Sequence, residues 1–311
     1  MADWDLIIIG AGPAGLAAAQ YGSRANLKCV IVEEMAPGGQ ALTIDDLENY
    51  PGFPKGVNGF QFSDDMRAQA EKFGAEFKSA SVKEIVKEGE DFVVKTARDE
   101  IKAPALIFAT GAKHRHLGAP GEEEFAGKGV SYCATCDGPF FKGKKILVVG
   151  GGDAACDEAV YLSKLSDQVK IIHRRDRFRA QKAVADRVIN DPNIEVNFNT
   201  TCEEIKGEMK VNKVVLKDTV TGELREEEMD AVFIFVGTIP QTQIAPDVDL
   251  DDMGYIKTNE KMETSLPGFY AVGDVRDTPF RQVITACADG AVAAHVASNY
   301  IDELRGQAYG K

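Results

Sequence analysis

The chain has 311 residues, of which 44% are hydrophobic and 27% charged, and this composition is typical of a soluble globular protein with room for two domains. Its formal net charge of −13 disfavours nucleic acid as a partner. The longest apolar runs, residues 6–9 and 231–236, have the length of a strand and are too short to cross a membrane. The first residues lack the basic segment of a secretory signal, so we expect a cytoplasmic protein with no membrane contact.

The N-terminal residues predict a strand, a glycine-rich turn, a helix and a second strand. Residues 4–9 are apolar, residues 13–23 are rich in helix formers, and residues 27–32 are apolar again. This order is the context of a dinucleotide-binding fingerprint, in which the backbone approaches a pyrophosphate at the start of a helix. Glu33 follows the second strand and suits a ribose without a 2′-phosphate, as in FAD or NAD. The residues of the first fingerprint are Gly10, Gly12, Pro13, Ala14 and Gly15.

The next elements predict a small meander and a returning strand. Residues 82–87, 92–96 and 101–103 are short strand signals separated by turns. Residues 106–111 then form an apolar strand that ends in glycine.

A Cys-x-x-Cys pair, Cys133 and Cys136, follows and predicts a small reducible disulfide. Half of a zinc site is the competing interpretation, but the other four cysteines are scattered singly and supply no second pair of ligands. No metal is therefore expected. Asp137 fits two roles equally, a turn residue or a general acid that protonates a departing thiolate.

A second fingerprint repeats the order of the first. A strand at residues 145–149 precedes a glycine-rich turn, a helix at 156–165 and a strand at 169–172. His173 lies 23 residues after Gly150, the spacing that also separates Gly10 from Glu33. Arginines at this ribose position favour a 2′-phosphate and hence NADPH, with a solvated charged surface as the alternative. The residues assigned to this site are Gly150, Gly152, Asp153, Ala154, Ala155, His173, Arg174, Arg175 and Arg179.

The duplication continues and predicts the fold. A hairpin at residues 211–217 and 224–228 precedes a return strand at 232–237, which ends at Gly237. The strand signal at 266–274 has no counterpart in the second unit, and a helical run at 282–297 follows it. We therefore expect an α/β fold with two Rossmann-like, three-layer ββα domains, the NADPH domain being inserted into a discontinuous FAD domain. The expected limits are 1–115 and 244–311 for the FAD domain and 116–243 for the NADPH domain, with linkers at 113–120 and 238–246.

Together these motifs resemble the bacterial-type, low-molecular-weight thioredoxin reductases over essentially the whole chain. Residues 38–40, 48–52, 109–112, 133–138, 173–179, 273–274 and 281–282 carry the resemblance beside the two fingerprints. It implies a homodimeric enzyme that uses FAD and NADPH to reduce thioredoxin. Asp274 is either a turn residue or the carboxylate that bonds the ribityl chain of FAD. The further residues assigned to cofactor binding are Glu34, Gly38, Gly39, Gln40, Asn49, Val82, Ala109, Thr110, Gly111, Gly237, Gly273, Asp274, Arg281, Gln282 and Val283.

The resemblance also implies the roles of the dithiol. Cys136 lies against the flavin, Cys133 attacks the disulfide of thioredoxin, and Asp137 donates the proton. Because the dithiol and the NADPH site share a domain, both reach the flavin only if this domain rotates about its linkers. Ala154 departs from the family, which often carries Ser or Thr there, and the basic linker at 113–116 has no interpretation.

Other functions stay open at this point. The dithiol could serve a glutaredoxin-like or peroxide-reducing partner, or act as a dithiol oxidase that passes electrons to oxygen. A ferredoxin-dependent reductase is disfavoured by the arginine run at 173–179. From another class, the chain could be a nucleotide-binding redox sensor, which would complete few catalytic cycles.

Overall fold

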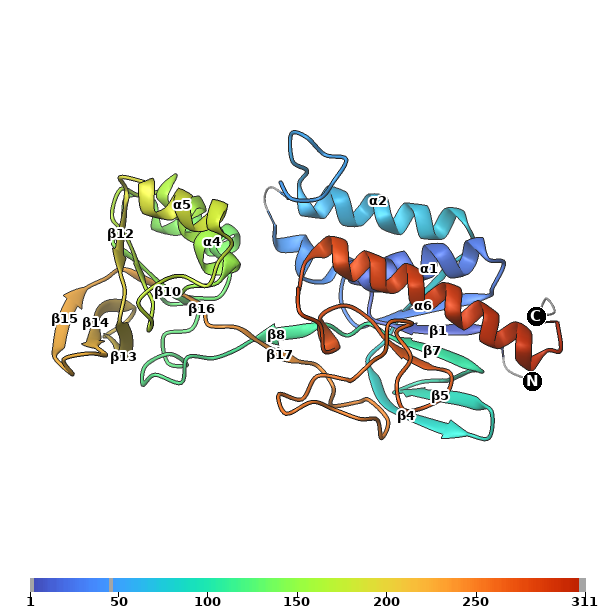
Figure 1. Ribbon diagram of the computed structural model, residues 1–311. Coiled ribbons are helices and arrows are strands. Elements are labelled where there is room, and N and C mark those ends of the chain that lie inside the picture. Colours follow the sequence, from blue (N-terminus) through green and yellow to red (C-terminus); the bar gives the residue numbers. More distant parts are fainter. Residues whose placement is uncertain (1–2, 45–46, 308–311) are drawn as a thin grey trace. The chain divides into compact units, whose positions relative to one another are not determined.

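The computed structural model describes residues 3–44 and 47–307, with the side chain of Cys136 outside the description. The chain divides into two compact units, one formed by Met1–Lys113 with Ile239–Lys311 and the other by His114–Thr238. The second unit is therefore inserted into the first (Figure 1). Each unit is built on a five-stranded parallel sheet, which confirms the predicted α/β class with two Rossmann-like domains.

The sheet of the first unit is parallel and has the order β18-β7-β1-β2-β3. Along β1, Leu6 and Ile8 point into a core shared with the helices, while Ile7 and Ile9 face the opposite layer. Both faces are thus buried, which explains why these strands are continuous apolar runs. The strands are β1 (Leu6–Ile9), β2 (Cys29–Glu33), β3 (Glu76–Ser79), β7 (Ala105–Phe108) and β18 (Phe269–Ala271).

Helices cover one face of this sheet and an antiparallel meander covers the other, giving three layers (Figure 1). The helices are α1 (Pro13–Arg24), α2 (Gly59–Lys72) and α6 (Val283–Leu304), with short 3₁₀ turns η1 (Gly39–Thr43) and η3 (Gly273–Val275). The meander is β4 (Val82–Glu88), β5 (Asp91–Thr96) and β6 (Glu100–Ala103), as predicted. None of the helices in the described ranges is long and apolar enough to cross a membrane.

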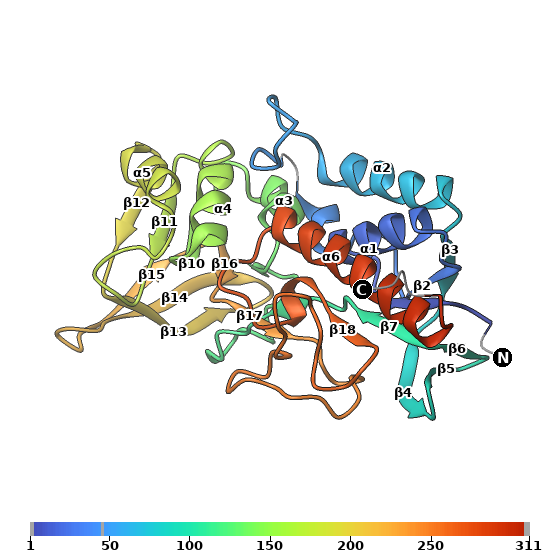
Figure 2. The same cartoon turned by 45° about the vertical axis from the view of Figure 1, so that its right-hand side comes forward.

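The second unit repeats these layers around a parallel sheet of order β12-β11-β10-β16-β9 (Figure 2). Its strands are β9 (Val130–Ser131), β10 (Ile146–Gly150), β11 (Val169–Ile172), β12 (Ile194–Asn197) and β16 (Ala231–Phe235). Its helices are α3 (Ala134–Asp137), α4 (Asp153–Ser163) and α5 (Lys182–Asn190), with the 3₁₀ turn η2 (Gly138–Phe141). The opposite layer contains β13 (Thr200–Gly207), β14 (Val211–Asp218) and β15 (Leu224–Glu228).

One expectation about the duplication is wrong. Strand β18 does have a counterpart, because β9 pairs with β16 in the second sheet as β18 pairs with β7 in the first. Strand β9 precedes the second glycine-rich turn in the chain, whereas β18 lies near the C-terminal end of the chain, long after the first glycine-rich turn. In addition, β13 turns the predicted hairpin into a three-stranded sheet, and α6 extends beyond the predicted end to Leu304. Where the chain passes between the units, β8 (Ala112–His114) pairs with β17 (Thr238–Pro240).

Candidate functional site

The first glycine-rich turn connects β1 to α1 and is shaped by close backbone contacts. Gly10 has a φ of 97°, and a Cβ atom there would lie 2.5 Å from the carbonyl oxygen of Ala109. A Cβ atom at Gly15 would overlap the carbonyl oxygen of Gly10. At Gly12, the N-cap of α1, a Cβ atom would meet nothing within 4 Å. The turn therefore leaves open space at the helix N-terminus, where backbone N–H groups favour a pyrophosphate.

Two further segments close around this turn. Glu33 at the end of β2 accepts hydrogen bonds from the N–H groups of Ala11 (2.7 Å) and Met35 (2.8 Å), so its carboxylate buttresses the turn. The N–H of Gly38 donates to the carbonyl of Ala11 (2.7 Å), and Gly39 lies against Gly12. The loop that carries Gly38 and Gly39 therefore borders the open space.

Several residues assigned to the first cofactor site form hydrogen bonds with residues far away in the sequence. The Gln40 amide donates to the carbonyl of Ala112 (2.7 Å), and the Asn49 amide donates to the Gln282 side chain (2.9 Å). The Thr110 hydroxyl donates to the carbonyl of Gln241 (2.7 Å). Gln241 was not predicted, and its backbone N–H also bonds the carbonyl of Gly111 (2.9 Å).

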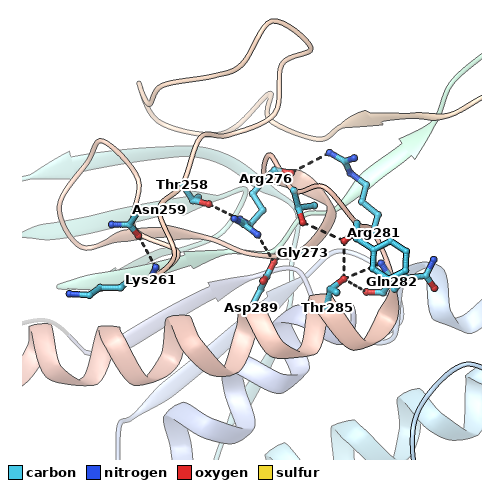
Figure 3. Close-up of polar contacts among 11 residues, drawn as sticks. Thr258, Asn259, Lys261, Gly273, Arg276, Arg281, Gln282, Thr285 and Asp289 are labelled. Atoms are coloured by element: carbon cyan, nitrogen blue, oxygen red, sulfur yellow. Dashed lines mark hydrogen bonds and ion pairs between the residues drawn. The ribbon is translucent and has the colours of Figure 1, made fainter.

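Three assigned residues lie at the margins of the first site. Val82 begins β4, two residues after Ala80 donates its N–H to the carbonyl of Glu33 (2.9 Å), which brings it to the end of β2. Glu34 is exposed. Val283 is the first residue of α6, which starts with a capping box between Gln282 and Thr285 (Figure 3).

A partly buried ion pair between Arg276 and Asp289 fixes the turn at Gly273 (Figure 3). The Asp289 carboxylate accepts from the N–H of Gly273 (3.1 Å) and from Arg276 Nη1 (3.2 Å), and Arg276 Nε donates to the Thr258 hydroxyl (2.6 Å). Burial raises the pKa of Asp289, although Arg276 and the Gly273 amide oppose this shift. Asp289 was missed from the sequence, although it is the one acidic residue within the expected helix at 282–297.

Asp274 and Arg281 complete the polar lining of this side. Burial raises the pKa of Asp274, and the nearby Arg281 opposes this shift. The Arg281 guanidinium lies 4.0 Å from the centre of the Tyr255 ring, and its Nη2 donates to the carbonyl of Arg276 (3.4 Å). Arg281 Nε is buried and has no partner among the described residues. An orphaned donor beside an open glycine cradle fits a bound nucleotide such as FAD.

The second glycine-rich turn has the same construction. A Cβ atom at Gly150 would overlap the carbonyl oxygen of Phe235, and one at Gly151 would overlap the His173 ring. Gly152, the N-cap of α4, again faces open space, and the helix has no side-chain cap. Ala155 is fully buried and packs beside Gly150. Ala154 is exposed and adds no polar group.

The arginine run lies directly after β11, beside this turn. The N–H of Arg179 donates to the carbonyl of Gly151 (2.6 Å), which ties the run to the glycines. Within the part of the chain that the structure describes, the side chains of Arg174, Arg175, Arg177 and Arg179 are exposed and form no ion pair. Guanidinium groups free of carboxylates fit a 2′-phosphate and hence NADPH.

Two assigned residues support the loop around this second turn. The Asp153 carboxylate accepts from the backbone N–H (2.7 Å) and the side chain (3.2 Å) of Gln181, so it braces the loop. His173 Nε2 is buried without a partner in the described chain, and burial, followed by the neighbouring arginines, lowers the pKa of His173. Gly237 lies between β16 and β17, has a φ of 112°, and a Cβ atom there would meet nothing within 4 Å.

The cysteine segment belongs to the same unit as the second turn. Cys133 is disulfide-bonded, and Cys29, Cys156, Cys202 and Cys287 are free and buried. Burial raises the pKa of each of these four thiols, so they are poor nucleophiles. The side chain of Cys136 lies outside the described residues, and its pairing with Cys133 stays a prediction. Asp137 ends α3 and donates its N–H to the carbonyl of Cys133 (3.2 Å).

Comparisons with known proteins identify the family of the chain. The family model for pyridine nucleotide-disulphide oxidoreductases matches residues 4–290. A thioredoxin reductase of Treponema pallidum is 54% identical over 97% of this chain and 99% of its own length. One of Bacillus subtilis is 46% identical over 97% and 96%, respectively. The crystal structure of Lactococcus lactis thioredoxin reductase is 42% identical, covers 97% of this chain and all of its own, and superposes with a TM-score of 0.94. The chain belongs to the pyridine nucleotide-disulphide oxidoreductase family.

Proposed function

We propose that the chain is a thioredoxin reductase that uses FAD and NADPH. The observation that carries this proposal is the combination of two open glycine cradles with a disulfide at Cys133, while four other cysteines are free and buried. Two nucleotide sites and one redox disulfide are the parts that an electron relay needs. The relatives that match nearly the full chain carry the same activity in their names.

The two cofactors are assigned by the chemistry of their cradles. FAD belongs to the first unit, where Glu33 disfavours a 2′-phosphate and Arg281 Nε is available to an acceptor. NADPH belongs to the second unit, where a run of exposed arginines follows β11. Asp274 is the carboxylate for the ribityl chain, and Asp289 holds its turn in place.

The cysteines carry the electrons to the protein substrate. When bound, FAD supplies the transfer of a hydride equivalent from NADPH to the Cys133 disulfide. Cys136 is then the thiol on the flavin side, and Cys133 attacks the disulfide of thioredoxin. A mixed disulfide forms between Cys133 and thioredoxin, and the departing thiolate of thioredoxin takes a proton from Asp137. The thiol of Cys136 then attacks the sulfur of Cys133, which re-forms the enzyme disulfide and releases thioredoxin with both of its sulfurs reduced. Because the dithiol and the arginines share a unit, we infer that this unit turns about its two linkers between the half-reactions.

We also infer the oligomeric state and the location of the protein. The exposed side of α6 presents Ile284, Ala288 and Val292 at intervals of four residues, an apolar stripe that supports a homodimer. The four free cysteines support a reducing compartment and hence a cytoplasmic location.

Steady-state oxidation of NADPH by the purified flavoprotein tests the proposal. Rapid oxidation that depends on oxidised thioredoxin is the expected result. A flavin that NADPH reduces but thioredoxin does not reoxidise would point to another disulfide partner. A flavin that NADPH does not reduce would refute the assignment of the arginine site.

A further inference from the structure

Tyr132, the residue before Cys133, is held by a buried carboxylate. Its hydroxyl lies 2.6 Å from Glu122 Oε1 and 2.8 Å from His116 Nδ1. The Glu122 side chain is only 2% exposed, and it also accepts from the N–H groups of Leu117 (2.9 Å) and Gly118 (2.6 Å). These hydrogen bonds compensate the burial of the Glu122 carboxylate and hold it in one position.

The protons of this network can be assigned. Burial would raise the pKa of Glu122, but the hydrogen bonds from Tyr132, Leu117 and Gly118 outweigh it and lower the pKa. Glu122 is therefore an ionised acceptor, and the single hydroxyl proton of Tyr132 points to it. His116 Nδ1 must then carry a proton and donate to the Tyr132 oxygen.

The network ties the entry of the second unit to the redox segment. The His114 ring stacks on Tyr132 with an interplanar angle of 18°, and the His116 ring lies edge-on to it. Through these rings and through Glu122, the stretch from 114 to 122 surrounds the residue that precedes Cys133. The basic linker thus has a structural role that the sequence did not reveal.

Cys133 itself is restrained from the same side. Its N–H donates to the Ser131 hydroxyl (3.1 Å), which also lies within 3.2 Å of the Cys133 carbonyl oxygen. Strand β9 holds Ser131 by pairing with β16. Tyr132 is the link between this restrained backbone and Glu122.

We propose that Tyr132 and Glu122 are positioning residues for Cys133, which favour its disulfide over the dithiol by restraining the chain before it. This inference rests on the proposed function only for the catalytic role of Cys133, because the restraint of the chain before Cys133 follows from the contacts themselves. Closing a disulfide costs the conformational entropy of the segment that it orders. A segment that is already held loses less, so the network shifts the equilibrium toward the disulfide.

The test is the thiol–disulfide equilibrium of the holoenzyme in glutathione buffers. Two glutathione thiols are oxidised to one glutathione disulfide while the Cys133 disulfide is reduced to two thiols. The fraction of free Cys133 is read by iodoacetamide alkylation and mass spectrometry, and the flavin is followed separately by absorbance. Tyr132→Phe keeps the ring and removes the hydroxyl, while Glu122→Gln places an amide nitrogen where Gly118 needs an acceptor.

We expect both variants to shift the equilibrium at least threefold toward the dithiol. The matched control Glu123→Gln, at an exposed neighbouring position, should leave it unchanged. If Tyr132→Phe and Glu122→Gln both stay within 1.5-fold of the wild type, with or without a lower melting temperature, the network is only structural and the proposal is wrong. If Tyr132→Phe does not fold, Glu122→Gln alone decides. Because thioredoxin is absent from this assay, a failure of the proposed function leaves its result intact.

Discussion

Gly12→Ala separates the two demands on the first glycine turn, the fold and the cofactor. A methyl group at Gly12 meets nothing within 4 Å, and the backbone there, with φ of −70° and ψ of 180°, is open to alanine. Alanine restricts the unfolded chain, which stabilises by about 0.4–1 kcal/mol, but it is a poorer N-cap by a similar amount. The two effects oppose each other, so we expect the free energy of unfolding to change by less than about 1 kcal/mol.

The affinity for FAD should change far more. The methyl group occupies the space that a pyrophosphate needs at the start of α1, so we expect FAD to bind at least tenfold more weakly, or about 1.4 kcal/mol. Titration of the FAD-depleted protein by quenching of flavin fluorescence measures this, and urea unfolding measures the stability. Gly152→Ala, equally open but in the second turn, is the matched control and should leave FAD affinity unchanged. Wild-type FAD affinity in Gly12→Ala would refute the location of the pyrophosphate.

Three other predictions concern the relay and the charges of the second unit. Cys133→Ser should keep the reduction of flavin by NADPH in stopped-flow absorbance and lose thioredoxin reduction; retained turnover would refute its role. Arg174→Ala and Arg175→Ala should each raise the KM for NADPH about tenfold, the value of one charged hydrogen bond, and leave that for NADH unchanged; equal effects on both would argue against the 2′-phosphate site. Burial raises the pKa of Glu158 to about 7 from 4.5, so its contribution to stability falls as pH rises between these values. The difference in the free energy of unfolding between Glu158→Gln and the wild type, measured in urea, should therefore shift in favour of the variant between pH 5 and pH 8, by up to about 3 kcal/mol. The same difference at both pH values would contradict this.

The sequence predicted those parts of the fold that local patterns determine. Strands buried on both faces, such as β1 and β10, are apolar runs in the sequence. The fingerprint glycines Gly10, Gly15 and Gly150 lie where the backbone passes too close to tolerate a Cβ atom. Strand β9 could not be found this way, because Val130 and Ser131 carry no periodic signal and become a strand only by pairing with β16. Strand β9 therefore forms only when the rest of the sheet is in place.

The same distinction between local patterns and contacts made by the folded chain applies to the site residues. Glu33 was singled out because it follows the second strand of the first fingerprint, a position that the motif fixes within one local unit. Asp289 was missed because its purpose depends on Gly273, sixteen residues earlier, and on a fold that brings the two together. The bond between Tyr132 and Glu122 was missed for the same reason, since neither residue belongs to a motif.

The central claim is that electrons leave the protein through the sulfur of Cys133. It is tested most directly with a Cys136→Ser variant and a thioredoxin whose single remaining active-site cysteine carries thionitrobenzoate. Attack by Cys133 should release one thionitrobenzoate per chain and leave a covalent complex, which peptide mass spectrometry assigns to Cys133. Attachment of thioredoxin to any other cysteine, or the same release from a variant that also lacks Cys133, would contradict the account.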